Sequence, residues 1–535
     1  MHFETGRRNV LHLSGLGLAT AGCGAGSAMA ATQHAAVKTF YDVRNFGARG
    51  DGKALDTAAI NRAIEAAAAA GGGTVIVPSG NYLSFSIRMK SQVHLVLQQG
   101  ATIIAADSPA PGQTSGTMGG RYDAAEPDTA WTPYQDYGHN HWHNSLIWGE
   151  NLHDVSITGP GLIWGKGLSH GRNVRTIGNV FKADQPGVGN KAIALKNCRN
   201  VHLADFSILK GGHFGLLLTA VDNLIIDGLT IDTDRDGIDI DCCQNVRVSN
   251  CAVNAPWDDA IVPKSSLALG YSRPCKNITI TNCYVSGCWQ LGTLLDGSFK
   301  RITDQNYAFF TGRIKLGTES NGGFINTTIS NCTFEGCQGL ALETVDGALL
   351  EDVTITNIAM QDIISCPIFL RLGARLRGPA ATTKPGTLRR VLISNITAHN
   401  CASHQSSIVS GIPGYAIEDV KISNVFVDHA GGGEAVAQVP ENESKYPEPN
   451  MFGPMPAHGF YFRHVRGLEI SHTEIRPLAA DPRPAFQLED VTRADFFAVT
   501  APGPAFSLKK VSDFRVGWSR AAADAVIASA DNRTL

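Results

Sequence analysis

The sequence predicts an all-β fold: a single-stranded, right-handed parallel β-helix with one short capping helix at its N-terminal end. The first observation behind this prediction is a short unit of alternating apolar and polar residues that recurs along the chain, bounded by Asn, Asp or Gly. The second is composition. Of the 535 residues, 57 are glycine and 17% are charged, whereas about a quarter is usual for globular domains. Abundant glycine and few charges suit a fold of short strands and many turns.

The charge balance limits the partners that the chain can have. With 45 Lys and Arg against 48 Asp and Glu, the formal net charge is −3, which excludes a strongly basic nucleic-acid-binding protein. Hydrophobic residues make up 43% of the chain, which is too many for a disordered protein. Beyond the N-terminus, no run reaches the roughly 18 uninterrupted apolar residues of a membrane helix. We therefore expect no nucleic-acid partner and no membrane span. A monomer is expected as well, because it is the default state of such solenoids.

Residues 1–30 are predicted to be an export signal. Arg7-Arg8 precedes an uncharged run over residues 10–30, which ends in Ala28-Met29-Ala30. Paired arginines, weak hydrophobicity and small residues at the end are typical of a bacterial twin-arginine signal, so a periplasmic or extracellular location is expected. A buried N-terminal helix and lipidation at Cys23 are the alternatives.

One helix is predicted ahead of the coil. It starts at Asp56 or Thr57, either of which can cap it, continues through an alanine-rich run and stops at Gly71-Gly72-Gly73. Its apolar face is expected to cover the open end of the coil, which would otherwise expose strand edges. The remaining chain, residues 31–535, is predicted to be one domain with its coil over about residues 40–515.

The strands are predicted from the repeated unit. Three successive units start at Asn200, Asn223 and Asn245, which are 23 and 22 residues apart. A period of roughly 20 to 25 residues indicates a solenoid. Helical repeats would show a period of about 3.6 residues, and leucine-rich repeats would need Leu at fixed places. The unit recurs at residues 154–159, 200–205, 223–228, 245–250, 277–282, 352–357 and 419–424.

The 12 cysteines contain no C-x-x-C pair, so a zinc ribbon is not expected. Four of them occupy the same place in the repeat, namely Cys198, Cys251, Cys283 and Cys332. A small residue that recurs at one place in a repeat is expected to form a buried stack, not a set of disulfides.

Acidic residues gather in the middle of the chain. Residues 232–241 hold five of them, and the pair Asp258-Asp259 follows 22 residues after Asp236, about one coil later. These carboxylates are expected to stack on one face. Arg313 and Lys315 are expected about two coils further on. Three carboxylates with two cations suit an acidic polysaccharide, because the acids can transfer protons and the cations can hold a sugar carboxylate.

Two other interpretations of the acidic cluster stay open. Asp and Asn are common at turns of such coils, where their side chains bond the backbone. Clustered carboxylates also suit calcium, although the spacing does not match an EF-hand loop.

These motifs resemble those of glycoside hydrolase family 28, the polygalacturonase family, and the chain is identified as a divergent member. Residues 45–53 and 72–82 resemble entry motifs of its pectin-lyase-like solenoid. The family's Asn-Thr-Asp motif falls on Asp234-Arg235-Asp236 with only its last residue kept. Its aspartate pair falls on Asp258-Asp259, and its Arg-x-Lys motif is intact at Arg313-Ile314-Lys315.

The resemblance covers roughly residues 40 to 430 and has one clear gap. Where the family carries Gly-His-Gly, residues 287–292 contain no His. Gln290 stands in this segment and is expected to bind substrate. The missing His leaves open whether the neighbouring sugar is galacturonate or rhamnose.

The resemblance implies an inverting hydrolase of α-linked, galacturonate-containing pectin, the acidic polysaccharide of plant cell walls. Asp258 would be the general acid, with a raised pKa, and Asp236 and Asp259 would activate water. Inversion calls for carboxyl groups about 6.5–9.5 Å apart. Arg313 and Lys315 would bind a uronate carboxylate. No metal or other cofactor is expected.

Three alternatives remain beside this interpretation. A rhamnogalacturonan-directed hydrolase belongs to the same family, and a calcium-dependent pectate lyase shares the fold. A non-catalytic glycan-binding β-helix, such as an adhesin, is the third. Internal and chain-end cleavage are both open, although the long insertion at residues 105–143 could close one end of the site.

Overall fold

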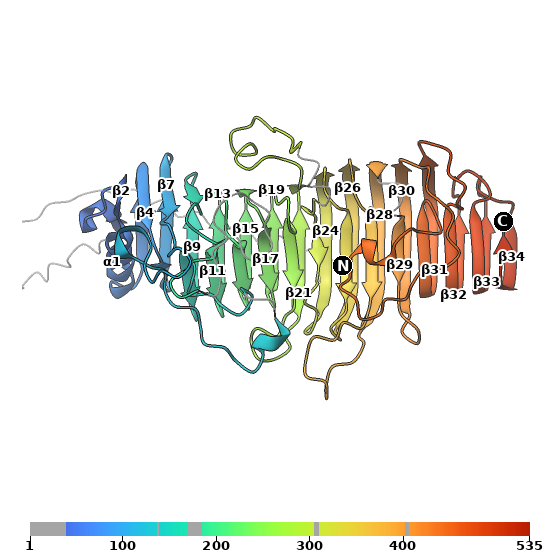
Figure 1. The fold of residues 1–535 in the computed structure, drawn as a ribbon, viewed down its shortest axis with the longest axis horizontal. Helices are drawn as coiled ribbons and strands as arrows, with labels where there is room; N and C mark the ends of the chain where they lie inside the picture. The colour runs from blue at the N-terminus through green and yellow to red at the C-terminus, as the bar shows by residue number, and fades with distance from the viewer. Residues whose placement is uncertain (1–38, 136–137, 170–184, 304–309, 402–405) are drawn as a thin grey trace, which may run out of the picture. The chain divides into compact units, whose positions relative to one another are not determined.

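The computed structural model describes residues 39–535, apart from residues 136–137, 170–184, 304–309 and 402–405. Residues 1–30, including Cys23, lie outside the described residues, so the export signal and the lipidation alternative stay predictions. In the described part, strands of successive coils pair in parallel, which confirms the predicted parallel β-helix (Figure 1). None of the helices described there is long and apolar enough to cross a membrane.

One column of strands pairs each coil with the next from β1 to β33. Asp222 lies opposite Gln244, and Gln244 opposite Lys276, in consecutive coils. The column consists of β1 (Phe40–Asp42), β3 (Gly73–Val77), β6 (Val93–Leu97), β9 (His153–Thr158), β12 (Arg199–Ala204), β15 (Asp222–Asp227), β18 (Gln244–Ser249), β21 (Cys275–Thr281), β24 (Phe324–Glu335), β26 (Leu349–Gln361), β28 (Thr387–Cys401), β30 (Ile417–His429), β31 (Phe460–Pro477), β32 (Phe486–Phe497) and β33 (Phe506–Gly517).

A second column runs beside it and merges with it at β24, whose second half pairs with β22. Its strands are β2 (Asp51–Leu55), β4 (Gly80–Ser84), β7 (Ala101–Ala105), β10 (Leu162–Trp164), β13 (Ser207–Leu209), β16 (Thr230–Asp232), β19 (Ala252–Asn254) and β22 (Tyr284–Ser286).

A third column, here named the site sheet, carries the acidic cluster. A bridge between Ile261 and Ile314 joins its two halves. Its strands are β5 (Ile87–Arg88), β8 (Ile147–Glu150), β11 (Lys191–Lys196), β14 (Phe214–Thr219), β17 (Asp236–Asp241), β20 (Ile261–Lys264), β23 (Lys315–Leu316), β25 (Leu340–Thr344), β27 (Ile368–Leu372) and β29 (Ser407–Ser410).

The core lies inside the coil, where aliphatic side chains stack in register. On the site sheet, one such stack joins five consecutive coils, and each member is fully buried. Burial of each of these side chains contributes roughly 1.5–3 kcal/mol, so the stack fixes the register of the strands that carry the site. Its members are Ile193, Leu216, Ile238, Ile261 and Ile314.

The outer face of the site sheet is also covered. Residues 106–146, here the N-side segment, contain η2 (Thr117–Gly119) and η3 (Thr132–Tyr134) and pack Trp142 against Phe214 and Leu217. Residues 430–459, here the C-side segment, contain η5 (Pro449–Phe452) and pack Phe452 and Met455 against β27 and β29. The polar side chains of the site sheet are therefore buried among loops instead of facing water.

The predicted helix is α1 (Thr57–Ala69), and its buried residues Ile60 and Ile64 contribute to the core near β1, β3 and β6. Neither predicted cap bonds the helix end. The Asp56 carboxylate accepts hydrogen bonds from the backbone amides of Arg49 (2.7 Å) and Gly50 (3.0 Å) instead. The Thr57 hydroxyl accepts one from the amide of Phe85.

Polar side chains stack along the coil as the repeat predicts. Asn277 donates to Asn245 (2.8 Å), Asn245 to Asn223 (3.4 Å) and Asn223 to Asn200 (3.1 Å). Each has a positive φ of 52–58°, a conformation that Asn tolerates well. The 11 cysteines among the described residues are free and buried, as predicted. Cys251, Cys283 and Cys332 occupy the same corner of successive coils, but Cys198 lies between β11 and β12 at another corner, so the predicted stack holds for three of its four members.

The coil ends close to the predicted limit. Phe486 lies opposite Phe506 in parallel strands β32 and β33, as the repeated Pro-Ala-Phe sequence indicates. After Gly517 the chain turns back, and β34 (Ala525–Ala530) and β35 (Arg533–Thr534) pair with β33 in antiparallel fashion.

Candidate active site

The three predicted catalytic aspartates meet on two neighbouring coils. Asp236 opens β17, and Asp258 and Asp259 lie in the turn before β20, which pairs with β17. The Asp259 amide donates to Asp236 Oδ1 (3.1 Å) and to Asp258 Oδ1 (3.2 Å). One carboxylate oxygen from each residue lies within 4.8 Å of the others. The sequence spacing therefore predicted this juxtaposition correctly.

The three carboxylates differ in exposure. The side chains of Asp236 and Asp259 are 3% and 5% exposed, whereas that of Asp258 is 27% exposed. Asp258 is thus the carboxylate that an incoming substrate can reach. These single oxygens lie closer together than the 6.5–9.5 Å expected between the carboxyl groups of an inverting pair.

The predicted pKa of Asp258 is wrong. Burial acts to raise it, but the Arg235 guanidinium, with Nη2 2.7 Å from Asp258 Oδ2, and the nearby Lys264 outweigh burial and hold the pKa below its usual value. Asp236 shows the opposite behaviour, because burial and the neighbouring Asp239 and Asp258 carboxylates raise its pKa well above the usual value. The arginine stands where the family motif has Thr.

Lys264 is a site residue that the sequence analysis missed. Its Nζ lies 3.1 Å from Asp236 Oδ2, 2.9 Å from Asp239 Oδ1 and 2.9 Å from His139 Nε2. Despite this cation, burial raises the pKa of Asp239 to about 7. Lys264 ends the apolar strand β20, one coil after Asp241. The sequence did contain a sign of this role: Lys264 ends an apolar strand next to an acidic one, and a buried charge needs a partner of opposite charge.

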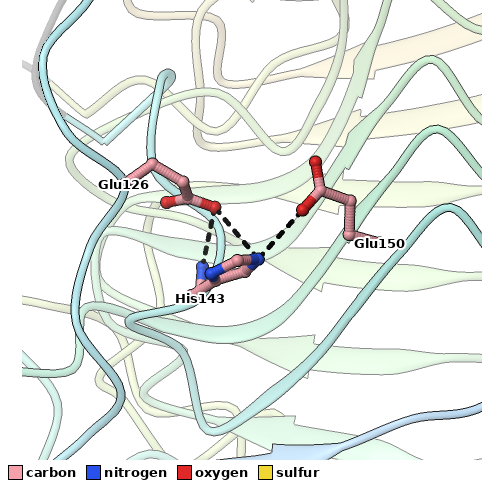
Figure 2. Close-up of side chains that lie close together, drawn as sticks. All are labelled: Glu126, His143 and Glu150. Atoms are coloured by element: carbon pink, nitrogen blue, oxygen red, sulfur yellow. Dashed lines mark hydrogen bonds and ion pairs between the residues drawn. The ribbon is translucent and has the colours of Figure 1, made fainter.

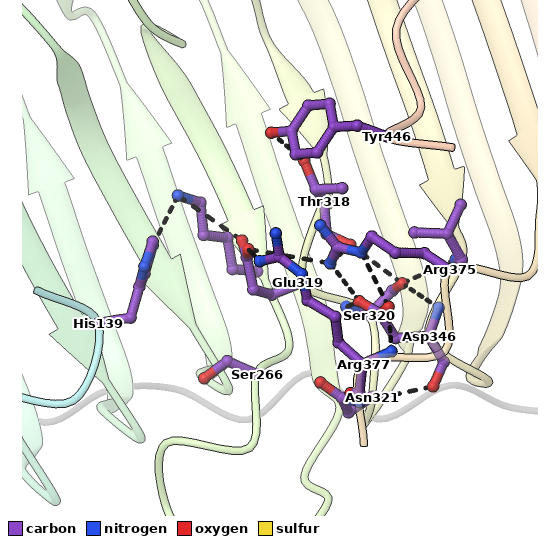
Figure 3. A network of polar contacts seen from close by, with 12 residues as sticks. His139, Ser266, Thr318, Glu319, Ser320, Asn321, Asp346, Arg375, Arg377 and Tyr446 are labelled. Carbon is purple, nitrogen blue, oxygen red and sulfur yellow. Dashed lines mark hydrogen bonds and ion pairs between the residues drawn. The ribbon is translucent and has the colours of Figure 1, made fainter. Parts of the chain in front are cut away.

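A polar network continues from this site towards β25 and β27. Glu319 lies 3.9 Å from Lys264 Nζ and 3.9 Å from Arg375 Nη2, and Asp346 holds Arg375 through its Nε (3.0 Å). Figure 3 shows Arg375 between Glu319 and Asp346, with Tyr446 beside Thr318. The Tyr446 and Thr318 hydroxyls are 2.9 Å apart. The network connects the acidic cluster to the C-side segment.

Arg313 and Lys315 lie one coil after Asp259, not two as predicted. Ile261 pairs directly with Ile314, because most of residues 266–313 form β21, β22 and an insertion of the same coil. Arg313 Nε donates to Asp259 Oδ1 (2.9 Å), and Lys315 Nζ lies 3.6 Å from Asp259 Oδ2. Both cations are almost fully buried, at 1% exposure.

The cation pair also meets two glutamates that the sequence analysis missed. Glu448 Oε1, from the C-side segment, lies 2.6 Å from Arg313 Nη2 and 3.3 Å from Lys315 Nζ. Glu343 Oε2, on β25, lies 3.5 Å from Lys315 Nζ. Glu448 is 133 residues from Lys315 in sequence, so no local pattern could have linked them.

Gln290 is exposed, and its side chain donates to the carbonyl of Arg301 (3.1 Å). Its segment is attached to Asp232, whose Oδ2 accepts hydrogen bonds from the amides of Gly292 (2.7 Å) and Leu294 (3.2 Å). Within the described part of the chain, no hydrogen bond of Gln290 reaches the three aspartates. Its predicted role in substrate binding stays a proposal.

Among the described residues, three clusters have a metal-like arrangement of ligands. In two of them, Asp236–Asp239–His139 and Asp236–Asp258–Asp259, lysine or arginine nitrogens already contact the carboxylates, so a cation would be repelled. The third joins Glu126, His143 and Glu150 (Figure 2). There the Glu126 carboxylate accepts from the amides of Trp142 and His143, and Lys196 pairs with Glu150 at 3.0 Å. The His143 ring, with Nε2 3.1 Å from Glu150 Oε2, joins the N-side segment to the site sheet.

Comparisons with known proteins agree with this description. A family model described as Rhamnogalacturonase A/epimerase, pectate lyase-like, matches residues 40–131, and one described as a right handed beta helix region matches residues 192–375. A probable polygalacturonase of Vitis vinifera is 27% identical over 240 residues, which is 41% of this chain and 43% of the relative. An exo-poly-alpha-D-galacturonosidase of Dickeya chrysanthemi is 23% identical over 267 residues, or 43% of this chain and 42% of the relative. The chain thus spans less than half the length of these curated relatives.

Solved structures show the same fold. A family 28 exopolygalacturonase of Yersinia enterocolitica superposes with a TM-score of 0.61 at 20% identity, covering 87% of this chain and 79% of the other. An exopolygalacturonase of Thermotoga maritima gives 0.53 at 18% identity, covering 73% and 87%. The β-helix is therefore of the predicted right-handed kind. In its partial sequence matches and its aspartate and Arg-x-Lys motifs the chain resembles the polygalacturonases of glycoside hydrolase family 28, and in its fold it resembles a family 28 exopolygalacturonase.

Proposed function

We propose that the protein is an exported, inverting glycoside hydrolase that cleaves α-linked, galacturonate-containing pectic polysaccharides or oligosaccharides. One observation carries the proposal: Asp236, Asp258 and Asp259 converge within 4.8 Å on two adjacent coils, beside buried cations. The polygalacturonase names of the relatives in sequence and fold support the substrate class. Paired carboxylates are the usual machinery of glycoside hydrolysis.

The roles follow from exposure and contacts. Asp258 is the exposed carboxyl and would donate a proton to the leaving oxygen, once Arg235 no longer holds it ionised. Asp236 and Asp259 would activate the attacking water. Lys264 would stabilise the ionised form of Asp236, because its ammonium lies 3.1 Å from Oδ2.

The surroundings of the site favour cleavage at chain ends. The N-side segment reaches Lys264 through His139, and the C-side segment reaches Arg313 and Lys315 through Glu448. Loops thus bound the aspartates on both sides along the coil, which would leave little room for a polysaccharide to pass through. The exo-acting names of two relatives point the same way.

A product assay tests the proposal. Purified protein with EDTA is incubated with polygalacturonate and, separately, with rhamnogalacturonan, and reducing ends and chromatographed products are followed. We expect saturated products, mainly monomers or dimers. Proton NMR of the first product should show the inverted anomer, and retention would contradict the inverting mechanism. Unsaturated products that appear only with calcium would make the protein a lyase. Failure to release sugar from either substrate would leave a glycan-binding protein.

The Asp258→Asn variant tests the role of the exposed carboxyl. General acid catalysis contributes roughly 10²–10⁴-fold, so we expect kcat on the better substrate to fall by that amount while the melting temperature is kept. Asp513→Asn is the matched control, because Asp513 is an exposed aspartate on β33, far along the sequence from the site. Residual activity of Asp258→Asn above a tenth of the parent would remove Asp258 from the acid role.

A further inference from the structure

The cation pair, Arg313 and Lys315, is already supplied with carboxylates by the protein. Arg313 meets Asp259 at 2.9 Å and Glu448 at 2.6 Å. Lys315 meets Glu448 at 3.3 Å, Glu343 at 3.5 Å and Asp259 at 3.6 Å. The Glu448 carboxylate, which touches both cations through one oxygen, is placed as the carboxylate of a bound uronate would be.

The C-side segment holds Glu448 firmly. Pro447 and Pro449 flank it and are both buried, and proline restricts the backbone on either side. Met451 and Phe452, which follow Pro449 closely in the chain, pack in a hydrophobic cluster against the site sheet.

Two buried arginines fix the backbone of the same segment. Arg371 donates to the carbonyl of Glu441 (3.0 Å), and Arg463 donates to those of Val439 (2.9 Å) and Pro440 (3.0 Å). Both guanidinium groups also lie over the ring of Phe452, at 5.2 and 5.5 Å. Glu448 is therefore part of a fixed wall and not of a strap that a substrate could push aside.

The local charges balance without a substrate. Two cations, Arg313 and Lys315, lie within ion-pair distance of the Asp259 and Glu448 carboxyl groups. Burial acts to raise the pKa of Glu448, but Arg313 and Lys315 outweigh it and keep the group ionised at neutral pH. Burial raises the pKa of Glu343 to about 8, so Glu343 is mostly protonated at neutral pH and adds no charge. A further carboxylate would meet no net positive charge and the like charge of Glu448.

We infer that Glu448 is a built-in counter-ion of the cation pair and that the sugar bound beside Arg313 and Lys315 is uncharged. The inference rests on the proposed function, because it names one sugar of that substrate. A pectic chain in which galacturonate alternates with a neutral sugar would fit, whereas a chain of consecutive galacturonates would bring a carboxylate to Glu448.

The same wall offers contacts that a neutral sugar can use. Glu448 Oε2 is buried and has no hydrogen-bond partner among the described residues, so it can accept a sugar hydroxyl. Tyr446 is 48% exposed, and its ring lies 5.5 Å from the Lys315 ammonium. An exposed aromatic ring at this place can pack against the apolar face of a pyranose.

The test compares two probes that differ only in charge: trigalacturonate and its carboxyl-reduced counterpart, in which each carboxylate is a primary alcohol. Their dissociation constants are measured by calorimetry in the Asp258→Asn background, so that neither probe is cleaved. Glu448→Gln keeps the shape and removes the charge. We expect it to tighten trigalacturonate binding about tenfold or more and to change binding of the reduced probe less than about threefold, since a like charge is removed only for the acid.

The matched control is Glu443→Gln, because Glu443 is an exposed glutamate on the same segment. It should leave both dissociation constants unchanged. A second measurement needs no change at Glu448. If Glu448 already neutralises the cation pair before substrate binds, trigalacturonate binding should weaken little between 50 and 300 mM salt. Binding to two cations without a counter-ion would weaken steeply over the same range.

Three outcomes would overturn the inference. They are unchanged or weaker trigalacturonate binding in Glu448→Gln, a steep salt dependence while Glu448 is present, and binding of neither probe. The proposed function is judged separately, by hydrolysis with Asp258 present. If neither probe is cleaved but Glu448→Gln shifts the binding ratio as expected, the hydrolase proposal fails and the inference about the sugar's charge holds.

Discussion

At the level of single residues, the contact between Arg235 and Asp258 controls the ionisation of the exposed carboxyl. Asp258 Oδ2 lies 2.7 Å from Arg235 Nη2, and both side chains are only partly exposed, at 27% and 17%. An opposite charge at this distance typically lowers a carboxyl pKa by about 1–3 units. A general acid with a low pKa is protonated in only a small fraction of molecules near neutral pH, so this pair should limit the fraction of protein in the active protonation state.

Arg235→Gln tests which role Asp258 has. Removing the guanidinium raises the Asp258 pKa towards its usual value. If Asp258 is the acid and Asp236, whose pKa is higher, is the base, the active form holds its proton on the group with the lower pKa. A raised Asp258 pKa then enlarges the active fraction, so kcat/KM at its optimum should rise by about tenfold for each pKa unit. Profiles of the parent and the variant on the same oligosaccharide measure this. Arg493→Gln, an exposed arginine paired with Asp419 on other coils, should leave both limbs in place. An upward shift of the acidic limb with no gain in kcat/KM at the optimum would instead make Asp258 the base.

At the level of elements, the Asn ladder ties one coil to the next at the exposed edge of the strands. Asn245 accepts from Asn277 (2.8 Å), donates to Asn223 (3.4 Å) and has a φ of 58°. The side chain thus serves two purposes, because it bridges coils and makes a left-handed backbone tolerable. Strand register in this column depends on both.

Asn245→Ala and Asn245→Gly separate these two contributions. Alanine loses the ladder bonds and strains the left-handed backbone, which costs roughly 1–2 kcal/mol in addition to about 1 kcal/mol for the hydrogen bonds. Glycine loses only the bonds and some backbone entropy. We therefore expect the parent to have the highest urea unfolding midpoint, the Gly variant a lower one and the Ala variant the lowest. Equal midpoints for the two variants would show that the backbone conformation contributes nothing measurable.

At the level of the whole molecule, buried acidic side chains on the outer face of the coil make the free energy of unfolding depend on pH. Burial raises the pKa of Asp232 to about 6, of Asp239 to about 7 and of Glu343 to about 8. In the unfolded chain these groups ionise near pH 4. Raised folded values mean that the stability they support is fully present below pH 4 and is lost as pH rises through 6 to 8. The unfolding free energy should therefore fall towards alkaline pH.

Glu343→Gln should reduce this fall. The amide stays neutral at every pH, so the variant no longer has to ionise a buried group as pH rises through about 8. Its melting temperature should match the parent near pH 4 and exceed it increasingly up to about pH 8. Glu469→Gln is the control, since Glu469 is an exposed glutamate paired with Lys421. A variant that melts below the parent at pH 9 would mean that ionised Glu343 stabilises Lys315 there.

Much of the fold was predictable because the repeat is local. The alternation of residues 200–205 and 223–228 specifies strands, and the Asn at each start specifies a left-handed turn. The helix limits followed from its alanines and glycines. The capping of the helix could not be predicted in this way, because the Asp56 carboxylate binds the backbone amides of Arg49 and Gly50 and not those of the helix. The prediction that Arg313 lies two coils after Asp259 was wrong, because the insertion between them lacks the repeat pattern by which coils can be counted.

The sequence by itself determined the β-helix and the meeting of Asp236 with Asp258 and Asp259, because one coil of about 22 residues separates them and stacked coils bring equal positions together. Only the tertiary structure decided their charges. Arg235 lowers the pKa of Asp258, Lys264 pairs with Asp236, and Glu448 neutralises Arg313 and Lys315. The physical reason is that ionisation depends on burial and on charges within a few ångströms. Neighbouring coils supply these charges, and in the case of Glu448 a loop distant in sequence does.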